Sequence, residues 1–379
     1  MKNKKKNLCG LRNAIIFTVI FVFLFVTASN VLLPKVKDDA TKKPINMIRS
    51  CNVLEKNTVD VVILGNSNAY RGINPMKIWM DCGITSCLIG HSFISEPEAY
   101  HRAKSFLENQ SPKMLVLETD CLFDTGNEFD ENGKLIFKDE ENEEIGFGIS
   151  SIQNKLDEAE QEILAALDSK YPTIKFNYRW KQLTLKELTN VTNKRSFTSR
   201  GFLTSKHIKP FEYGDTYMDK KDKAKEPIDS LHLKYFHKII DLCKEKDIKL
   251  ALVTIPSGYS WNMRKHNTVK ELAKENGLSY IDFNTRSDLI PTFDWTKDTK
   301  DEGLHLNNTG ASKVTAAYEK LLKNKYGLKP TELTDEQREV WNSDTEIFCE
   351  SNFNFPKEKT RKILEKNQRK FLNKSHEKH

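Results

Sequence analysis

The sequence has only one long hydrophobic run, and a single run excludes a polytopic membrane protein. Of its 379 residues, 38% are hydrophobic, which is somewhat low but well above the level of a disordered chain. It also lacks any CxxC motif with a partner pair, so we expect no zinc site, no other metal and no cofactor. A chain of this length with a real core forms one large domain or two medium ones.

The net charge of +7 is confined to the two ends of the chain. Residues 1–13 carry five basic residues and no acid, and residues 356–379 have a net charge of +6, which leaves −4 for the rest. Neither basic end shows interleaved aromatics or a known nucleic-acid-binding module. We therefore expect no nucleic-acid partner.

The hydrophobic run lies near the N-terminus. Between Arg12 and Lys35 there are 22 residues without a charge. About 20 residues of helix span a bilayer core of roughly 30 Å. The run therefore predicts a transmembrane anchor at residues 14–34.

The charges around this anchor predict its orientation. Residues 1–13 stay cytoplasmic under the positive-inside rule, which leaves the chain from residue 35 onward outside the cell membrane, beginning with a polar stalk at 35–56. The alternative is a cleaved signal peptide that ends near residues 26–28.

Seven cysteines are spread along the chain, six of them after the predicted anchor, and an even number permits disulfides. Cys82 and Cys87 are candidates for a pair. Cys121 and Cys243 lie in stretches that resemble a buried strand and a helix, where a cysteine acts as a small apolar residue.

Continuous apolar runs alternate with amphipathic stretches over most of the chain. This alternation predicts an α/β fold, a three-layer α/β/α sandwich with a central parallel sheet. The predicted strands are 59–65, 87–90, 114–120, 249–256 and 279–283, and the predicted helices are 78–83, 96–109, 230–246, 263–276 and 309–325.

Two regions depart from this rhythm. Within the predicted catalytic domain, 57–327, an insertion at 124–230 holds acidic, turn-like sequence and a helix near 151–169. After it, residues 328–379 form a polar, basic C-terminal extension, whose end predicts a frayed amphipathic helix.

Polar residues gather where the predicted strands end, which is where ligands bind in such sheets. Ser67 follows the first strand and is the candidate nucleophile, and His305 is the candidate base. A serine hydroxyl needs both a base and a group that holds the base. Asp301 is the favoured acid to orient the imidazole, because it leaves Gly303 free for the turn, and Glu302 in the same loop is the alternative. The backbone N–H groups of Ser67 and Gly90 are candidate oxyanion donors.

Three blocks of sequence resemble the SGNH/GDSL hydrolases: ILGNSNAYRGINP at 63–75, LIGHS at 88–92 and DEGLHLNNTGA at 301–311. The resemblance implies a flavodoxin-like sheet, a serine nucleophile in the first block, an oxyanion-hole glycine in the second, and an acid and a histidine in the last.

The finer resemblance is to membrane-anchored cell-envelope members, which include DltD-like proteins and the alginate O-acetylation type. It implies transfer of an O-acyl group, most often acetyl, to or from an envelope polysaccharide or a teichoic-type polymer. It also implies a multi-span membrane O-acyltransferase as a partner. One alternative is an esterase or deacetylase with the same triad. The other is a catalytically inactive module that binds an envelope polymer or a partner protein.

One position departs from the family pattern. The third block of the family usually supplies an oxyanion-hole asparagine, whereas Asp120 stands there in this chain. An ionised aspartate only accepts hydrogen bonds. Asn66 or Asn68 is then the candidate donor, and Asp120 has either a place in the acyl pocket or a structural role.

Further residues near the strand ends are candidate substrate contacts. Arg71 could bind an anionic group or pair with a carboxylate, His91 could line the acyl pocket or belong to the loop, and Trp261 could line the cleft or pack in the core. We expect Glu118 to make an internal pair and Asn307 to cap the last helix.

Overall fold

The computed structural model describes residues 2–32, 36–37, 44–45, 54–90, 92, 94–123, 177–181, 183, 185 and 198–376. The chain divides into two compact units. One combines residues 1–35 with 127–193, and the other combines 36–126 with 194–379. The predicted insertion is therefore divided, because its part from 194 onward belongs to the second unit. The predicted helix at 151–169 lies outside the described residues.

The second unit contains a five-stranded sheet in which every strand runs parallel to its neighbours. The strand order, β4-β3-β5-β6-β7, is the flavodoxin-like order, with the first strand between the second and the third. The strands are β3 (Val61–Leu64), β4 (Ser86–Leu88), β5 (Met114–Glu118), β6 (Lys249–Thr254) and β7 (Ser279–Asp282). The predicted α/β fold with a central parallel sheet is confirmed.

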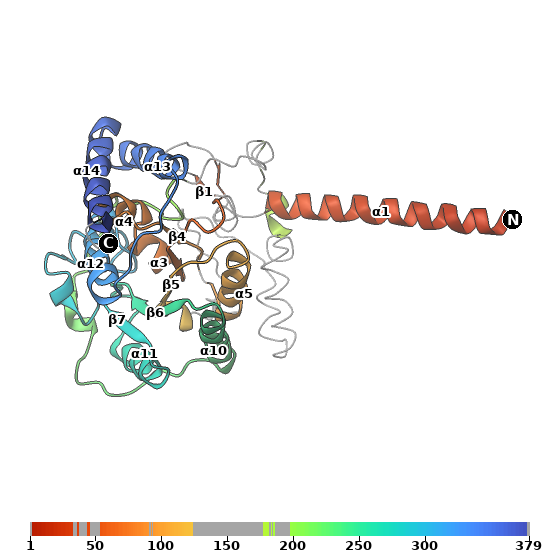
Figure 1. Ribbon diagram of the computed structural model, residues 1–379. Coiled ribbons are helices and arrows are strands. Elements are labelled where there is room, and N and C mark those ends of the chain that lie inside the picture. The colour runs from red at the N-terminus through yellow and green to blue at the C-terminus, as the bar shows by residue number, and fades with distance from the viewer. Residues whose placement is uncertain are drawn as a thin grey trace. The chain divides into compact units, whose positions relative to one another are not determined.

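Helices cover both faces of this sheet (Figure 1). On one face are α3 (Ser67–Gly72), α4 (Pro75–Cys82) and α12 (Asn308–Lys320), and on the other are α5 (Glu96–Phe106), α10 (Ser230–Glu245) and α11 (Met263–Glu275). Successive strand residues point to opposite faces. In β3, accordingly, Val61 and Ile63 pack in the first core, whereas Val62 and Leu64 pack in the second.

Short elements complete the unit. They are the antiparallel pair β1 (Val36–Lys37) and β2 (Pro44–Ile45), the 3-10 turns η2 (Thr119–Leu122), η4 (Gly214–Tyr217) and η5 (Ser287–Leu289), and the π-helical turn η6 (Leu321–Lys325) that ends α12.

The candidate pair Cys82 and Cys87 forms no disulfide, since both are free, buried thiols. Cys82 ends α4 and lies in the core of one sheet face, whereas Cys87 points from β4 into the core of the other. The sheet therefore separates two residues that are close in sequence. Cys121 and Cys243 are buried thiols, as expected.

The C-terminal region forms two helices, α13 (Asp335–Phe353) and α14 (Lys357–His376), which pack against each other and against α4. The polar extension contributes to the core, because the buried side chains of Trp341, Phe348 and Leu364 join the cluster that covers the sheet. The basic tail, for which the sequence predicts a frayed amphipathic helix, forms the helix α14, and the buried side chain of Leu364 attaches this helix to the core.

Replacing Trp341 with alanine is expected to lower the free energy of unfolding by about 3–5 kcal/mol, the usual cost of removing a buried tryptophan. Its ring contacts Trp79 at 5.5 Å between centroids and lies 4.3 Å from the Arg200 guanidinium carbon. Chemical denaturation measures the loss. The control is Val340→Ala, which changes an exposed neighbour and should leave the denaturation midpoint in place. An unchanged midpoint in Trp341→Ala as well would mean that the C-terminal helices are only loosely attached.

The first unit contains α1 (Lys2–Leu32) and the short turn η3 (Asn177–Lys181). Within α1, residues Gly10–Ser29 have a mean hydropathy of 2.2, and most of their side chains are exposed. This helix is long and apolar enough to be a single-pass membrane anchor, and a signal sequence would have the same properties.

Candidate active site

The carboxyl ends of β3 and β4 meet closely, and glycines make the approach possible. A Cβ atom at Gly90 would lie 1.6 Å from the carbonyl oxygen of Gly65, and one at Gly65 would lie 2.6 Å from Cβ of Glu118. Ser67 follows at once as the first residue of α3. Asn66 caps this helix, because its side-chain oxygen accepts a hydrogen bond from the backbone N–H of Asn68. Ser67 is thus held on a tight strand-to-helix turn.

Ser67, His305 and Asp301 form one continuous chain of hydrogen bonds. The Ser67 Oγ lies 2.7 Å from Nε2 of His305, and Nδ1 of the same ring lies 2.6 Å from Oδ2 of Asp301. The other carboxylate oxygen of Asp301 accepts a bond of 2.6 Å from the backbone N–H of His305. This is the geometry in which a histidine can take the serine proton while a carboxylate fixes the orientation of the ring.

The structure distinguishes between the two candidate acids. Glu302 has a positive φ of 59°, and its carboxylate points outward, where it is 63% exposed and pairs with Lys209. Gly303 follows with φ of 92°, and this turn brings Asp301 back to His305. Asp301 rather than Glu302 therefore contacts the imidazole.

Ser257, which belongs to the polar residues at the predicted strand ends, and Gly258, which the sequence did not suggest, hold this loop against the end of β6. The Ser257 Oγ donates to the carbonyl of Leu304 at 2.9 Å, and the N–H of Gly258 donates to the carbonyl of Gly303 at 2.8 Å. These contacts fix the loop on the N-terminal side of His305. On the C-terminal side Asn307 caps α12, as expected.

Burial and charge act on the acid–base groups. Burial lowers the pKa of His305, the Asp301 carboxylate raises it, and the Arg71 and Lys300 cations lower it further, so that the net shift is downward. For Asp301, burial favours the neutral form, but the hydrogen bonds from His305 outweigh burial and lower its pKa. At neutral pH the pair is a neutral imidazole beside a carboxylate, which is the state that a general base requires.

The pH dependence of catalysis is expected to follow His305. Because a protonated imidazole cannot accept the serine proton, kcat/KM falls as the pH drops through the pKa of His305. Since that pKa is lowered, the midpoint of the acid limb lies below about 6.5, the ordinary histidine value. A pH profile of ester turnover measures it. A midpoint above 7 would mean that Asp301 outweighs burial and the two cations.

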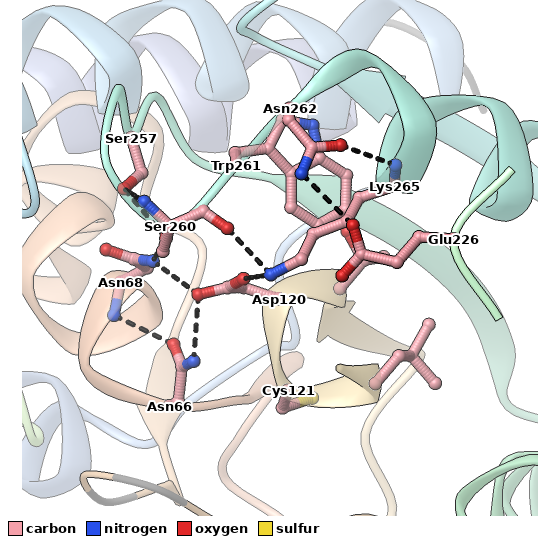
Figure 2. A network of polar contacts seen from close by, with 12 residues as sticks. Asn66, Asn68, Asp120, Cys121, Glu226, Ser257, Ser260, Trp261, Asn262 and Lys265 are labelled. Carbon is pink, nitrogen blue, oxygen red and sulfur yellow. Dashed lines mark hydrogen bonds and ion pairs between the residues drawn. The ribbon is translucent and has the colours of Figure 1, made fainter. Parts of the chain in front are cut away.

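Asp120 is the centre of a polar network that includes Asn66 and Asn68, the two neighbours of Ser67 in the sequence (Figure 2). Its Oδ2 accepts hydrogen bonds from the side-chain amides of Asn66 at 3.2 Å and Asn68 at 2.9 Å. Lys265 lies on the other side, with its Nζ 3.5 Å from Oδ1. Each of these two amides, the candidate oxyanion donors, therefore directs an N–H group at Asp120, and the amide of Asn68 also donates to the Ser260 hydroxyl at 3.1 Å.

Lys265 and Glu118 complete the network. Lys265 also donates to the carbonyl of Ser260 at 2.7 Å and lies over the Phe123 ring, at 5.2 Å from its centroid. Glu118 is fully buried, and burial, together with the nearby Asp120 charge, raises its pKa well above the usual range. Its carboxyl group accepts the backbone N–H of Asp120 at 3.3 Å.

The remaining candidates have different outcomes. Trp261 does not line a cleft: it is 2% exposed, packs against Phe123 and donates to Asp282 at 3.0 Å, because its ring fills the core between α11 and the sheet. Arg71 is buried beside His305, close enough for its charge to lower the pKa of the ring. His91 lies outside the described residues.

Among the residues that the structure describes, no group of three or more His, Cys, Asp or Glu side chains has the arrangement of a metal site. The polar groups assembled here are a serine, a histidine and an aspartate in series, the order that nucleophilic acyl transfer uses.

No protein-family model matches this sequence, and no curated protein matches it either. Among solved structures, one that is similar is a presumed acylhydrolase from Bacteroides fragilis NCTC 9343, with 14% identity and a TM-score of 0.35. The match covers 74% of this chain and 95% of the Bacteroides chain. A likeness this distant assigns neither the family nor the activity of this chain.

Proposed function

We propose that this protein is a serine-dependent acyl-transfer enzyme that acts on ester bonds. The observation that carries the proposal is the hydrogen-bond chain from Ser67 through His305 to Asp301. In the first step the Ser67 oxygen attacks the ester carbonyl while His305 takes the serine proton. His305 then gives that proton to the departing alcohol, which leaves an acyl group on Ser67.

The second step releases the acyl group to an acceptor hydroxyl. His305 takes the proton of the acceptor, whose oxygen attacks the acyl-serine, and the proton returns to Ser67. Water as the acceptor gives an esterase or deacetylase, and a sugar hydroxyl gives an O-acyltransferase. The two activities use the same residues and differ in whether water is excluded from this step.

The finer proposal places the reaction outside the cell membrane. The apolar α1 would be a single-pass anchor with a cytoplasmic N-terminus. The α/β unit would act, through an acetyl-serine, on an envelope polysaccharide or a teichoic-type polymer. A multi-span membrane O-acyltransferase would be its partner. The basic residues before the apolar run support this orientation. A tethered enzyme suits transfer to a polymer that is fixed to the same membrane.

The contacts of Asp120 favour a second candidate, a catalytically inactive module that binds polymer or partner. Asn66 and Asn68 each direct an amide N–H to Asp120, which leaves more of the oxyanion stabilisation to the backbone N–H groups of Ser67 and Gly90. Such a module would keep the fold and bind polymer without turning over an ester.

Turnover of simple esters by the full-length protein in detergent tests the two candidates. The acyl-transfer proposal predicts release of acetate from an aryl acetate or an acetylated polysaccharide, and transfer to a polyol when one is added. The inactive module predicts polymer binding without acetate release. If no ester is cleaved and a fluorophosphonate modifies no residue, the enzyme proposal is wrong.

A further inference from the structure

The proposed nucleophile and base lie in segments that are far apart in the chain. Ser67 begins α3 and His305 lies in the loop before α12, 238 positions later. Proton transfer between them needs their hydrogen-bond distance of 2.7 Å, and a displacement of about 1 Å can lower a rate by on the order of 100-fold. Residues 257–260, between β6 and α11, contact both segments. These contacts can therefore set the distance between nucleophile and base.

Ser260 contacts the segment of the nucleophile through Asn68, the residue that follows Ser67 (Figure 2). The Nδ2 group of Asn68 donates to the Ser260 hydroxyl at 3.1 Å and to the Asp120 carboxylate at 2.9 Å. A side-chain amide has two N–H groups, so it can supply one to each oxygen. Because an ionised carboxylate only accepts hydrogen bonds, Asp120 fixes which end of the amide faces Ser260.

Ser257 contacts the segment of the base through Leu304, the residue that precedes His305. Its Oγ lies 2.9 Å from the carbonyl oxygen of Leu304 and 2.8 Å from the Oγ of Ser260. A carbonyl oxygen cannot donate, so the single proton of the Ser257 hydroxyl points to Leu304. The proton of the Ser260 hydroxyl must then point to Ser257. The hydrogen bonds therefore run in one direction, from Asn68 to Leu304 through the two serine hydroxyls.

This chain of hydrogen bonds is buried and is attached to the fold at a second point. Asn68 is 3% exposed and Ser257 is 1% exposed. Hydrogen bonds in series strengthen one another where water is scarce, and a broken member leaves buried polar groups unsatisfied. The carbonyl of Ser260 also accepts a bond of 2.7 Å from Lys265, whose ammonium nitrogen lies 3.5 Å from Asp120. Ser260 is thus held through both its backbone and its side chain.

We propose that Ser260 is a positioning residue of the active site. Its hydroxyl joins the turn that carries Ser67 to the loop that carries His305, and so keeps the two side chains at the distance that proton transfer requires. The inference depends on the proposed acyl transfer, and it adds a residue that acts through its neighbours rather than on the reacting atoms. Loss of the hydroxyl should therefore slow the chemical step and leave the binding of an ester largely unchanged.

Ser260→Ala in the full-length protein removes the hydroxyl and keeps the carbonyl that accepts Lys265. For an aryl acetate, kcat is expected to fall by about 10-fold while KM stays within about twofold, because the loss is one of orientation. Tyr259→Phe is the matched control, since it removes a hydroxyl from a neighbouring side chain that is 76% exposed, and it should keep the parental kcat and KM. A parental kcat in Ser260→Ala would overturn the proposal, and so would a loss that appears in KM alone.

A double-mutant cycle with Ser257→Ala tests whether the two hydroxyls act as one chain. Each single substitution breaks the chain, so the double variant is expected to lose about as much kcat as the more impaired single variant. Two residues that support the fold at separate points would give losses that multiply, and that result would contradict the proposal. The kcat values refer to active sites titrated with a fluorophosphonate, so that unfolded protein does not contribute.

An NMR measurement keeps the test independent of turnover. In protein with labelled histidine, the Nε2 signal of His305 reports the hydrogen bond to Ser67. Ser260→Ala is expected to move this signal toward its position in Ser67→Ala, where the bond is absent, and Tyr259→Phe should leave it in place. If the signal keeps its parental position in Ser260→Ala, the positioning role is wrong. If the signal moves but the parent cleaves no ester, the positioning role stands and the proposed acyl transfer fails.

Discussion

Ser67→Ala is expected to lower ester turnover by roughly a thousandfold or more, because the substitution removes the atom that forms the acyl bond. The remaining activity would come from binding and oxyanion stabilisation alone. The fold should be little affected, since Asn66 rather than Ser67 caps α3 and the Ser67 hydroxyl bonds only within the triad among the contacts described above. The comparison requires kcat and KM for the same ester in parent and variant, together with a denaturation curve for each.

Ser279→Ala is the matched control for Ser67→Ala. The Ser279 hydroxyl contacts the Tyr326 hydroxyl at 3.1 Å, and Ser279 begins β7, at the end of the sheet opposite to the predicted site. It should retain parental turnover. If Ser67→Ala and Ser279→Ala turned over ester equally, the activity would not depend on Ser67, and another nucleophile would have to be found.

Asp301→Asn is expected to lower kcat by about a thousandfold to ten-thousandfold while KM changes much less. The carboxylate accepts Nδ1–H of His305 and so leaves Nε2 free to receive the serine proton. An asparagine can offer an N–H to the ring instead, which favours the wrong tautomer and leaves the geometry nearly intact. The loss should therefore appear in the chemical step rather than in binding.

Glu302→Gln provides the comparison for Asp301→Asn. It removes a carboxylate from the neighbouring position, but Glu302 pairs with Lys209 at the surface and faces away from His305. Its kcat should stay within about threefold of the parent value, as for a surface ion pair of little energetic weight. A larger loss in Glu302→Gln than in Asp301→Asn would show that the loop rearranges and that Glu302 is the acid in solution.

The sheet could be predicted from the sequence because parallel strands buried on both faces are continuous apolar runs. VVIL in β3 and MLVL in β5 are such runs, and polar residues follow each of them within two positions. The position of Ser67 at a strand end follows from that alternation. The contact between Ser67 and His305 joins residues 238 positions apart, and its prediction needed the sequence blocks as well as the rhythm of the strands.

The surroundings of the triad could not be predicted in the same way. Asp120 and Lys265 are 145 residues apart, and no spacing in the sequence relates them. Lys300 resembles an ordinary loop lysine until the hairpin that holds Asp301 and His305 buries its side chain. Such contacts depend on the tertiary path of the loops, which local patterns do not encode.

The C-terminal helices and Trp261 show the same dependence on tertiary packing. The C-terminal residues have a strongly polar composition, yet a few apolar side chains such as Trp341 and Leu364 are enough to bind α13 and α14 to the core. Trp261 was ambiguous for the opposite reason, since an aromatic residue beside a predicted cleft can face either the substrate or the core. Its buried hydrogen bond to Asp282 depends on the packing of α11 on the sheet.

The proposed role of Ser67 as the nucleophile is tested most directly by covalent labelling. The full-length protein is treated with a fluorophosphonate, digested, and analysed by mass spectrometry to locate the modified residue. The triad predicts one modification, on Ser67, which disappears in Ser67→Ala and is strongly slowed in His305→Ala. Modification of a different residue, or equal labelling of parent and Ser67→Ala, would contradict the assignment.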